Sequence, residues 1–409
     1  MAATSGKAKT PYERRSKISQ IVCNQAAAAE SSDHQKRMRE RKNATTLPED
    51  LILAEILPRI PAKYILRCRL VCKSWNSVFS TPAFVNSHLT HQLHNSEEND
   101  RIIIKRYGFN EQVDILSLTN SIRVPKVPCA CDKLCGSING LVLIVSTPRR
   151  RFCLWNPAIG QVRLFDFPPL DVHYAGFCWD HVQNDYKVLM FCHAISRQIF
   201  IYSTNSATWT SLPGFMLWMS PGPSTIVKGT PYWSYPISLT LPGEKLKRKF
   251  FSTFKFVPEI NEFRILPDLD SLKCRGNNFN IANIRDRLVG MAYKLVNRGE
   301  SNTMVDMYSL DDEESSSGVW SKMYSIGPVC LDSTQWLSQA FRNGGEILIR
   351  GDSGPCAFYD PKTKEIKSIA GTTSTFLREF GGRCYSYMPS LVRVRGMESM
   401  QNFSTNGVS

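Results

Sequence analysis

The stretch Phe152-Cys153-Leu154-Trp155-Asn156-Pro157, followed by Val162-Arg163-Leu164-Phe165, shows the unit from which most of this chain is built. The unit reads as a β-strand that ends in an aromatic residue and a polar turn, followed by a second strand with a Trp or an aliphatic residue. Its copies are anchored on Trp155, Tyr202, Phe254, Tyr308 and Tyr359. These anchors lie 47, 52, 54 and 51 residues apart, a period typical of kelch-type blades.

Further short strands lie between the anchors, for example in residues 140–145 and 186–191. They allow about four strands per repeat, which is the number in one blade of a β-propeller. A sixth, less regular copy begins at Val113. We therefore predict a large all-β repeat domain over residues 101–395, a kelch-like β-propeller whose first and last strands pair where the ring closes. A β-sandwich is the alternative, because the copies do not each carry the Gly-Gly pair of strict kelch repeats.

Residues 47–89 have a different pattern, which indicates a small all-α segment of three short helices. Pro48 suits the first turn of a helix, where its missing N–H has no partner to lose, and the prolines that follow end that helix before residue 62. A second helix is expected over Ala62–Cys68 and a third over residues 72–79. A unit of this size buries little of its own surface, so its many apolar side chains predict a partner.

The order Leu-Pro-x-x-Leu-x-x-x-x-Ile-Leu-x-x-Ile-Pro from Leu47, followed by Val-Cys-Lys-x-Trp from Val71, resembles the F-box. The resemblance implies docking to a Skp-type adaptor and, through it, to a cullin and a RING subunit. It places these adaptor-binding positions in this chain: Leu47, Pro48, Leu51, Ile52, Ile56, Leu57, Ile60, Pro61, Leu66, Val71, Cys72 and Trp75. The alternative is a helical hairpin that only caps the following domain.

The β-domain also resembles a family, the plant F-box proteins with an F-box-associated or kelch-like C-terminal domain. The matching pieces include Asn139-Gly140-Leu141-Val142-Leu143, Leu154-Trp155-Asn156-Pro157 and Gly229-Thr230-Pro231-Tyr232-Trp233. The resemblance implies a substrate-recognition subunit of a Skp-cullin-F-box ubiquitin ligase, which would hold its protein target near the ubiquitin-charged enzyme. The target and the residues that bind it are not specified by these motifs.

Charge and composition set the remaining boundaries. The chain of 409 residues has a formal net charge of +14, and residues 1–43 hold ten Lys or Arg against four acidic residues. We expect a disordered basic tail there, with a possible nuclear-localisation signal at residues 36–42, followed by the F-box over 44–92, a linker over 93–100 and a second tail over 396–409. No membrane span or signal peptide is recognisable, and the 13 cysteines have no paired spacing. Both observations favour the nucleus or the cytoplasm and no membrane partner.

Three sequence signals resemble chemical sites, and each has a simpler explanation. Gly351-Asp352-Ser353-Gly354-Pro355 resembles a serine-protease motif but has no matching base, and we predict a hairpin turn. His88, His91 and His94 are expected in a polar linker helix. Cys129, Cys131 and Cys135 do not have the paired spacing of a zinc site. No catalytic residue, metal or cofactor is therefore predicted.

Two other classes of protein remain as alternatives. A propeller enzyme would need a convergent set of metal ligands and acid or base groups. A nucleic-acid regulator that acts through the basic tail would lose DNA binding steeply as the salt concentration rises. Nucleic acid is not the expected partner, because much of the positive charge lies in the tail.

Overall fold

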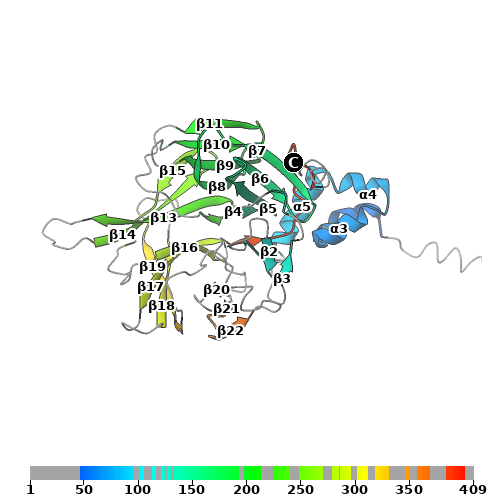
Figure 1. Cartoon of the computed structure of the whole chain (residues 1–409). Coiled ribbons are helices and arrows are strands. Elements are labelled where there is room, and N and C mark those ends of the chain that lie inside the picture. Colours follow the sequence, from blue (N-terminus) through cyan, green and yellow to red (C-terminus); the bar gives the residue numbers. More distant parts are fainter. Residues whose placement is uncertain are drawn as a thin grey trace, which may run out of the picture. The chain divides into compact units, whose positions relative to one another are not determined.

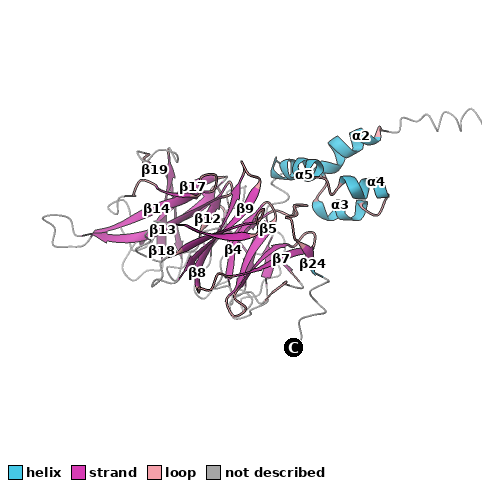
Figure 2. Cartoon of the chain, turned by 90° about the horizontal axis from the view of Figure 1, so that it is seen from above, coloured by secondary structure: helices cyan, strands magenta, loops and turns pink. Residues whose placement is uncertain are grey.

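The computed structural model divides the chain into two compact units, Met1–Leu57 and Pro58–Ser409. The structure describes residues 47–400, apart from gaps at 95–100, 106–112, 117–120, 125–126, 130–132, 193–197, 213–223, 240–247, 270–278, 285, 296–301, 312–317, 331–345, 350–356 and 369–383. Figure 2 shows that the described helices belong to the first part of this range and that strands make up the rest.

The described part of the first unit is short. It contains α2 (Glu49–Leu51), which continues as the π-helical turn η1 (Ile52–Ile56). Pro48 precedes α2 as its N-cap, and Glu49 and Asp50 occupy the first turn, where acidic side chains favour the positive end of the helix dipole. The predicted first helix is therefore present, although its hydrogen bonding changes along its length.

The second unit begins with helices and continues as strands. The 3₁₀ turn η2 (Leu57–Arg59) spans the boundary between the units. It is followed by α3 (Ala62–Cys68), α4 (Lys73–Val78) and α5 (Pro82–His94). The second predicted helix has the predicted bounds, and the third is one residue shorter at each end. The longest helix, α5, corresponds to the helix expected around the three histidines.

Six antiparallel sheets follow within the described residues (Figure 1). In hydrogen-bonded order, the first sheet consists of β23 (Cys384–Tyr387), β1 (Arg101–Lys105), β2 (Val113–Leu116) and β3 (Ser121–Arg123). The second sheet consists of β24 (Glu398–Ser399), β7 (Gln161–Asp166), β6 (Arg151–Asn156), β5 (Leu141–Ser146) and β4 (Lys133–Ile138). The third sheet consists of β11 (Thr208–Leu212), β10 (Ile199–Ser203), β9 (Asp185–Cys192) and β8 (Val172–Asp180).

The next three sheets come from the second half of the chain. The fourth sheet consists of β12 (Thr225–Val227), β13 (Thr230–Leu239), β14 (Arg248–Val257) and β15 (Glu262–Ile265). The fifth consists of β16 (Phe279–Ile284), β17 (Arg287–Leu295), β18 (Asn302–Leu310) and β19 (Trp320–Cys330). The sixth consists of β20 (Ile347–Ile349), β21 (Ala357–Tyr359) and β22 (Ile366–Ser368).

The sheets pack in chain order, each against the next, through separate apolar clusters. The first sheet closes by pairing β1 with β23, which lies almost 300 residues later along the chain, so Ile103 faces Tyr385 across the seam. This order and this closure are those of a β-propeller, the fold predicted from the repeat, and not of a sandwich. Strand β2 begins at Val113, the residue from which the sequence predicts a less regular copy, and it lies in the first of the six sheets.

The anchor aromatics explain why the repeat is regular. Trp155, Tyr202, Phe254, Tyr308 and Tyr359 lie in β6, β10, β14, β18 and β21, and all five are buried. Each occupies a strand that pairs with a neighbour on both sides, so its ring fills the space between adjacent sheets. Burial of such large side chains is the main stabilising contribution to a sheet of this kind.

The innermost strands approach one another closely, and glycine allows that approach. A Cβ atom on Gly136 of β4 would lie 2.7 Å from Cδ1 of Ile226 in β12 and 2.8 Å from Cβ of Phe177 in β8. Any larger residue would push these strands apart, so the inner ends of three sheets meet at this glycine.

The C-terminal segment is part of the fold. Residues 396–400, which the sequence assigns to a tail, include β24, and β24 pairs with β7 through Glu398 and Val162. Asn156 donates from Nδ2 to the carbonyl oxygens of Ser390 and Val392, at 3.2 and 2.8 Å. The chain is therefore fixed to the second sheet well beyond the closing strand β23.

Candidate functional site

Apolar side chains of the first unit are exposed. Leu47 is 56% exposed, and Leu51 and Ile56 are also largely open to solvent, whereas Ile52 is partly covered. Leu57 alone among the predicted apolar positions of this unit is buried. The turn of helix at Glu49–Leu51 thus carries Leu51 on the outside, which is opposite to the arrangement of a helix that serves only a core.

The helices of the second unit have their own exposed apolar surface. Ile65 and Phe79 are fully buried and form the interior of this helical segment. Leu70 and Val71, in the turn between α3 and α4, are 88% and 64% exposed. Two adjacent aliphatic residues at that exposure gain nothing from the fold of the chain itself, so they indicate a surface for a partner.

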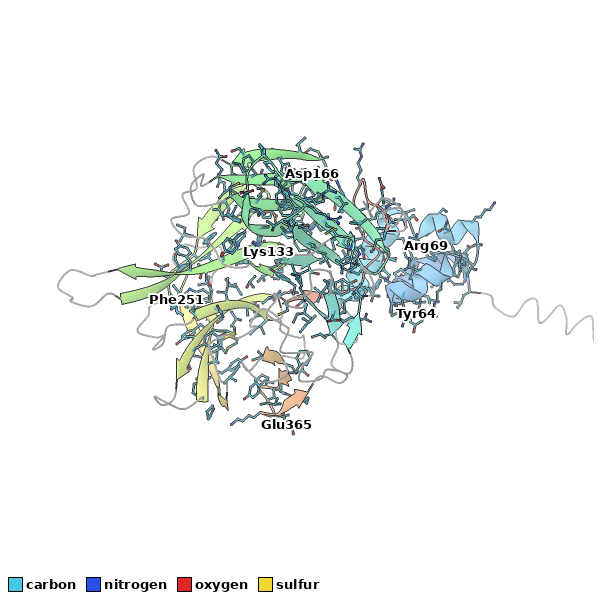
Figure 3. The ribbon with its side chains drawn as sticks, viewed as in Figure 1. Tyr64, Arg69, Lys133, Asp166, Phe251 and Glu365 are labelled. Carbon is cyan, nitrogen blue, oxygen red and sulfur yellow. The ribbon has the colours of Figure 1, made fainter. Side chains whose placement is uncertain are left out.

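The remaining predicted positions of this unit lie in α3 and α4 or just before these helices. Pro61 and Cys72 are exposed, and Ile60, Leu66 and Trp75 are partly buried. Figure 3 shows Tyr64 on α3 and Arg69 after its end, on the same helical segment. Tyr64 is an exposed aromatic residue that is not among the positions given by the F-box resemblance. The exposed Leu70 is not among them either. The sequence signal that could have found both is an apolar residue that does not belong to the buried side of α3.

The local sequence holds the turn between α3 and α4 in place. Cys72 caps α4 and accepts a hydrogen bond at its Sγ from the backbone N–H of Trp75, at 3.5 Å. The Trp75 ring then meets Phe79 edge to face, with centroids 5.9 Å apart. The exposed Val71 therefore precedes a capped helix whose interior side is anchored by a buried aromatic residue.

Two buried polar side chains of α5 hold the Ile60-Pro61 turn. Nε2 of His88 lies 3.0 Å from the carbonyl oxygen of Ile60, and Gln92 donates to the same oxygen at 3.4 Å. Burial lowers the pKa of His88, although its bond to Ile60 acts in the opposite direction. The prediction of a polar linker helix is wrong at this residue, because the side chain of His88 is buried. The helix itself is present and ends at His94.

The other face of α5 belongs to the β-domain. Val85 and Leu89 pack against the apolar cluster between the second and third sheets, to which Val394 and Met397 of the C-terminal segment also contribute. Capping of the β-domain thus explains these two side chains. It does not explain Leu70 and Val71, which stay exposed.

The signals that resemble chemical sites can be placed only in part. Ser353 and Cys131 lie outside the described residues. Cys129 and Cys135 are buried, and no group of three potential metal ligands occurs among the residues that the structure describes. Within the same residues, no helix has the length and apolar character to cross a membrane.

Comparison with known proteins gives two family matches. A model described as an F-box domain matches residues 45–86, and a model described as an F-box associated beta propeller domain matches residues 103–394. The second match alone covers more than half of the chain.

Relatives from Arabidopsis thaliana are named for an F-box, and one of them also for kelch repeats. One that is named as an F-box protein is 24% identical over 400 residues, which cover 85% of this chain and 94% of the relative. An F-box/kelch-repeat protein is 25% identical and is matched over 82% of this chain and 80% of its own length. Another F-box relative is 26% identical over 237 residues, and this chain spans only 62% of its length.

Proposed function

This chain belongs to the F-box proteins that carry an F-box associated beta propeller domain, and we propose that it is the substrate-recognition subunit of a Skp-cullin-F-box ubiquitin ligase. In this role the F-box binds a Skp-type adaptor, and the adaptor connects it to a cullin and a RING subunit. The β-propeller holds the protein target.

The observation that carries the proposal is the exposure of Leu70 and Val71 in one unit and of Leu47 and Leu51 in the other. Each of these side chains would contribute about 1.5–3 kcal/mol if it were fully buried against a partner. All except Leu70 occupy positions that the F-box resemblance assigns to adaptor contact. Within the second unit, the Cys72 cap and the buried Phe79 fix the helix that follows Val71, and His88 fixes Ile60, so binding there requires little reordering of side chains.

The mechanism requires no chemistry from this chain. An adaptor bound at one end and a target bound at the other convert transfer of ubiquitin from a bimolecular encounter into a reaction within one assembly. Rigid coupling serves this purpose, because a target that is held at a constant distance presents the same lysines repeatedly. The packing of Val85 and Leu89 on the β-domain supplies such coupling within the second unit.

The proposal includes the compartment in which the protein works. Cys129, Cys153 and Cys178 are buried thiols among the described residues. Thiols of this kind are typical of the reducing nucleus and cytosol, where cullin-RING ligases would operate.

Reconstitution tests the proposal directly. The purified chain would be combined with a Skp-type adaptor, a cullin, a RING subunit, ubiquitin and its activating and conjugating enzymes, and ubiquitin attached to the chain's own lysines would be followed on immunoblots. We expect ubiquitin to be attached only when the adaptor is present, and not on the Val71→Asp variant. Attachment that is equally fast without the adaptor would refute the proposal.

A further inference from the structure

Two hairpin tips from neighbouring sheets are joined by a buried lysine. Nζ of Lys187 in β9 donates to Oδ2 of Asp180 at 2.8 Å, to the carbonyl oxygen of Pro258 at 2.7 Å and to Oδ1 of Asn261 at 3.0 Å. Asp180 ends β8, whereas Pro258 and Asn261 belong to the turn between β14 and β15. Lys187 therefore links Asp180, which precedes the turn at 181–184, to the turn at 258–261.

The first of these turns is also rigid in itself. Oδ1 of Asp180 accepts hydrogen bonds from the backbone N–H groups of Val182, at 3.0 Å, and Gln183, at 2.9 Å. Asn184 completes the turn with a φ of 52°, a backbone conformation that Asn tolerates better than most residues. Two backbone donors of the turn are therefore held by one carboxylate oxygen.

The outer surface of the two tips carries aliphatic residues in positions that usually hold polar ones. Val182 is 71% exposed and Ile260 is 48% exposed. Nδ1 of His181 lies 2.7 Å from Oε1 of Glu259, so each aliphatic residue is the sequence neighbour of one member of this pair. We call Val182 and Ile260, with the His181–Glu259 pair, the tip surface. Because the turns beneath are already ordered, a partner would gain the apolar contact at little entropic cost.

Charged residues at the borders of the tip surface differ in sign. The exposed Lys228 lies in the turn between β12 and β13, and the carbonyl oxygen of Gly229 in this turn accepts a hydrogen bond from the backbone N–H of Trp179, at 2.9 Å. The turn that holds Lys228 is thus bonded to β8 three residues before Val182. Glu262, which pairs with Val257 across the second hairpin, is exposed on the Ile260 side.

We propose that the tip surface binds an extended segment of the target protein, which places an apolar side chain on Val182 and Ile260 and a carboxylate at Lys228. On the Ile260 side the segment carries a neutral or basic residue, since Glu262 repels a second carboxylate. This proposal rests on the function proposed above and names the class of segment that the β-domain recognises.

The size of the tip surface favours a short segment over a second copy of this chain. A stable protein interface covers about 800 Å² on each partner and is usually apolar at its centre. Two aliphatic side chains beside the His181–Glu259 contact supply only a small part of that area. They suit a brief contact with one anchoring side chain, and the flanking charges then select the sequence.

The test uses a library of short random peptides displayed on phage and selected against the full chain. We expect the selected peptides to carry an aliphatic or aromatic residue with Asp or Glu on one side only. A synthetic peptide of this kind should bind the double variant Val182→Asp, Ile260→Asp at least about tenfold more weakly, a loss of about 1.4 kcal/mol. The control Val319→Asp changes a valine of similar exposure just before β19 of the fifth sheet and should leave the affinity unchanged.

Charge reversal makes the test specific to Lys228. Lys228→Glu should weaken the binding of the same peptide, and replacing the peptide's acidic residue with Lys should restore binding to this variant. The proposal is overturned if no peptide is selected above the background of the double variant, if the selected peptides lack this pattern, or if the double variant only dissociates a dimer of the chain. Adaptor binding, measured in the same preparations, should be unchanged in every variant, so a failure of the F-box is recognised separately.

Discussion

The guanidinium of Arg163 donates a hydrogen bond of 2.8 Å from Nη1 to the carbonyl oxygen of Arg395, and this bond joins β7 to the C-terminal segment. The same Nη1 donates to the carbonyl oxygen of Thr204 at 2.8 Å, and Nη2 donates to the hydroxyl of Tyr202 at 2.7 Å. One buried side chain therefore connects the second sheet, the third sheet and the segment that follows the closing strand.

Arg163→Met should lower the free energy of unfolding by about 2–4 kcal/mol, because each buried acceptor that loses its donor costs about 1–3 kcal/mol. The measurement is a urea unfolding curve of the purified chain. Arg395→Lys is the matched control, because its side chain is exposed and only its carbonyl oxygen takes part. Equal stability of Arg163→Met and the wild type would show that the C-terminal segment is not held by this contact.

Acid should weaken the joint between the third and fourth sheets. Burial raises the pKa of Asp180, but its hydrogen bonds with Lys187 and with the backbone of Gln183 outweigh this effect, and the pKa lies below its ordinary value. A carboxyl group whose pKa is lowered by folding stabilises the protein above the pKa of the unfolded chain, about 3.9, and this contribution disappears as the pH falls through the folded pKa.

Asp180→Asn should therefore unfold at a lower temperature than the wild type at pH 7, and the difference should shrink as the pH is lowered below about 4. Removal of one partner from a buried ion pair costs about 3–5 kcal/mol at neutral pH. Thermal unfolding followed by circular dichroism gives both values. Asp171→Asn changes an exposed carboxylate and should have little effect at either pH. A difference between Asp180→Asn and the wild type that grows in acid would contradict the sign of this shift.

Deletion of the F-box should reveal how much α5 contributes to the β-domain. A fragment that begins at residue 81 keeps Val85 and Leu89 on their apolar cluster, whereas one that begins at residue 95 exposes that cluster. We expect both fragments to fold and the shorter one to unfold at a lower temperature. Leu89→Ala in the full chain should have a similar but smaller effect, and Leu93→Ala, an exposed leucine of the same helix, should have almost none. Identical unfolding of the two fragments would show that α5 is only a linker.

The sequence predicts the β-domain well because its signal is periodic. Trp155 and Tyr202 recur at the same place in successive sheets, and a ring that must be buried there leaves a visible pattern. The helical bounds of α3 follow equally directly, since Pro61 precedes it and apolar residues mark its buried side.

The contacts that depend on distant partners could not be predicted in the same way. His88 has the appearance of a polar surface residue, and only the carbonyl oxygen of Ile60, 28 positions earlier, explains its burial. Lys187 and Arg163 likewise occupy strand positions where charged residues usually face solvent. The acceptors Pro258 for Lys187 and Thr204 for Arg163 come from turns of neighbouring sheets, and a single sequence does not show which turns meet.

Binding of a purified Skp-type adaptor, measured by isothermal titration calorimetry, tests the central claim most directly. We expect Leu51→Asp and Val71→Asp each to weaken binding at least about a hundredfold, a loss of about 2.7 kcal/mol, because each places a charge in an apolar contact. Leu93→Asp is the control, since Leu93 is an equally exposed leucine outside the predicted positions, and its affinity should equal that of the wild type. If the adaptor binds the Leu51 and Val71 variants as tightly as the wild type, the exposed apolar residues of this segment are not an adaptor-binding surface and the proposed function is wrong.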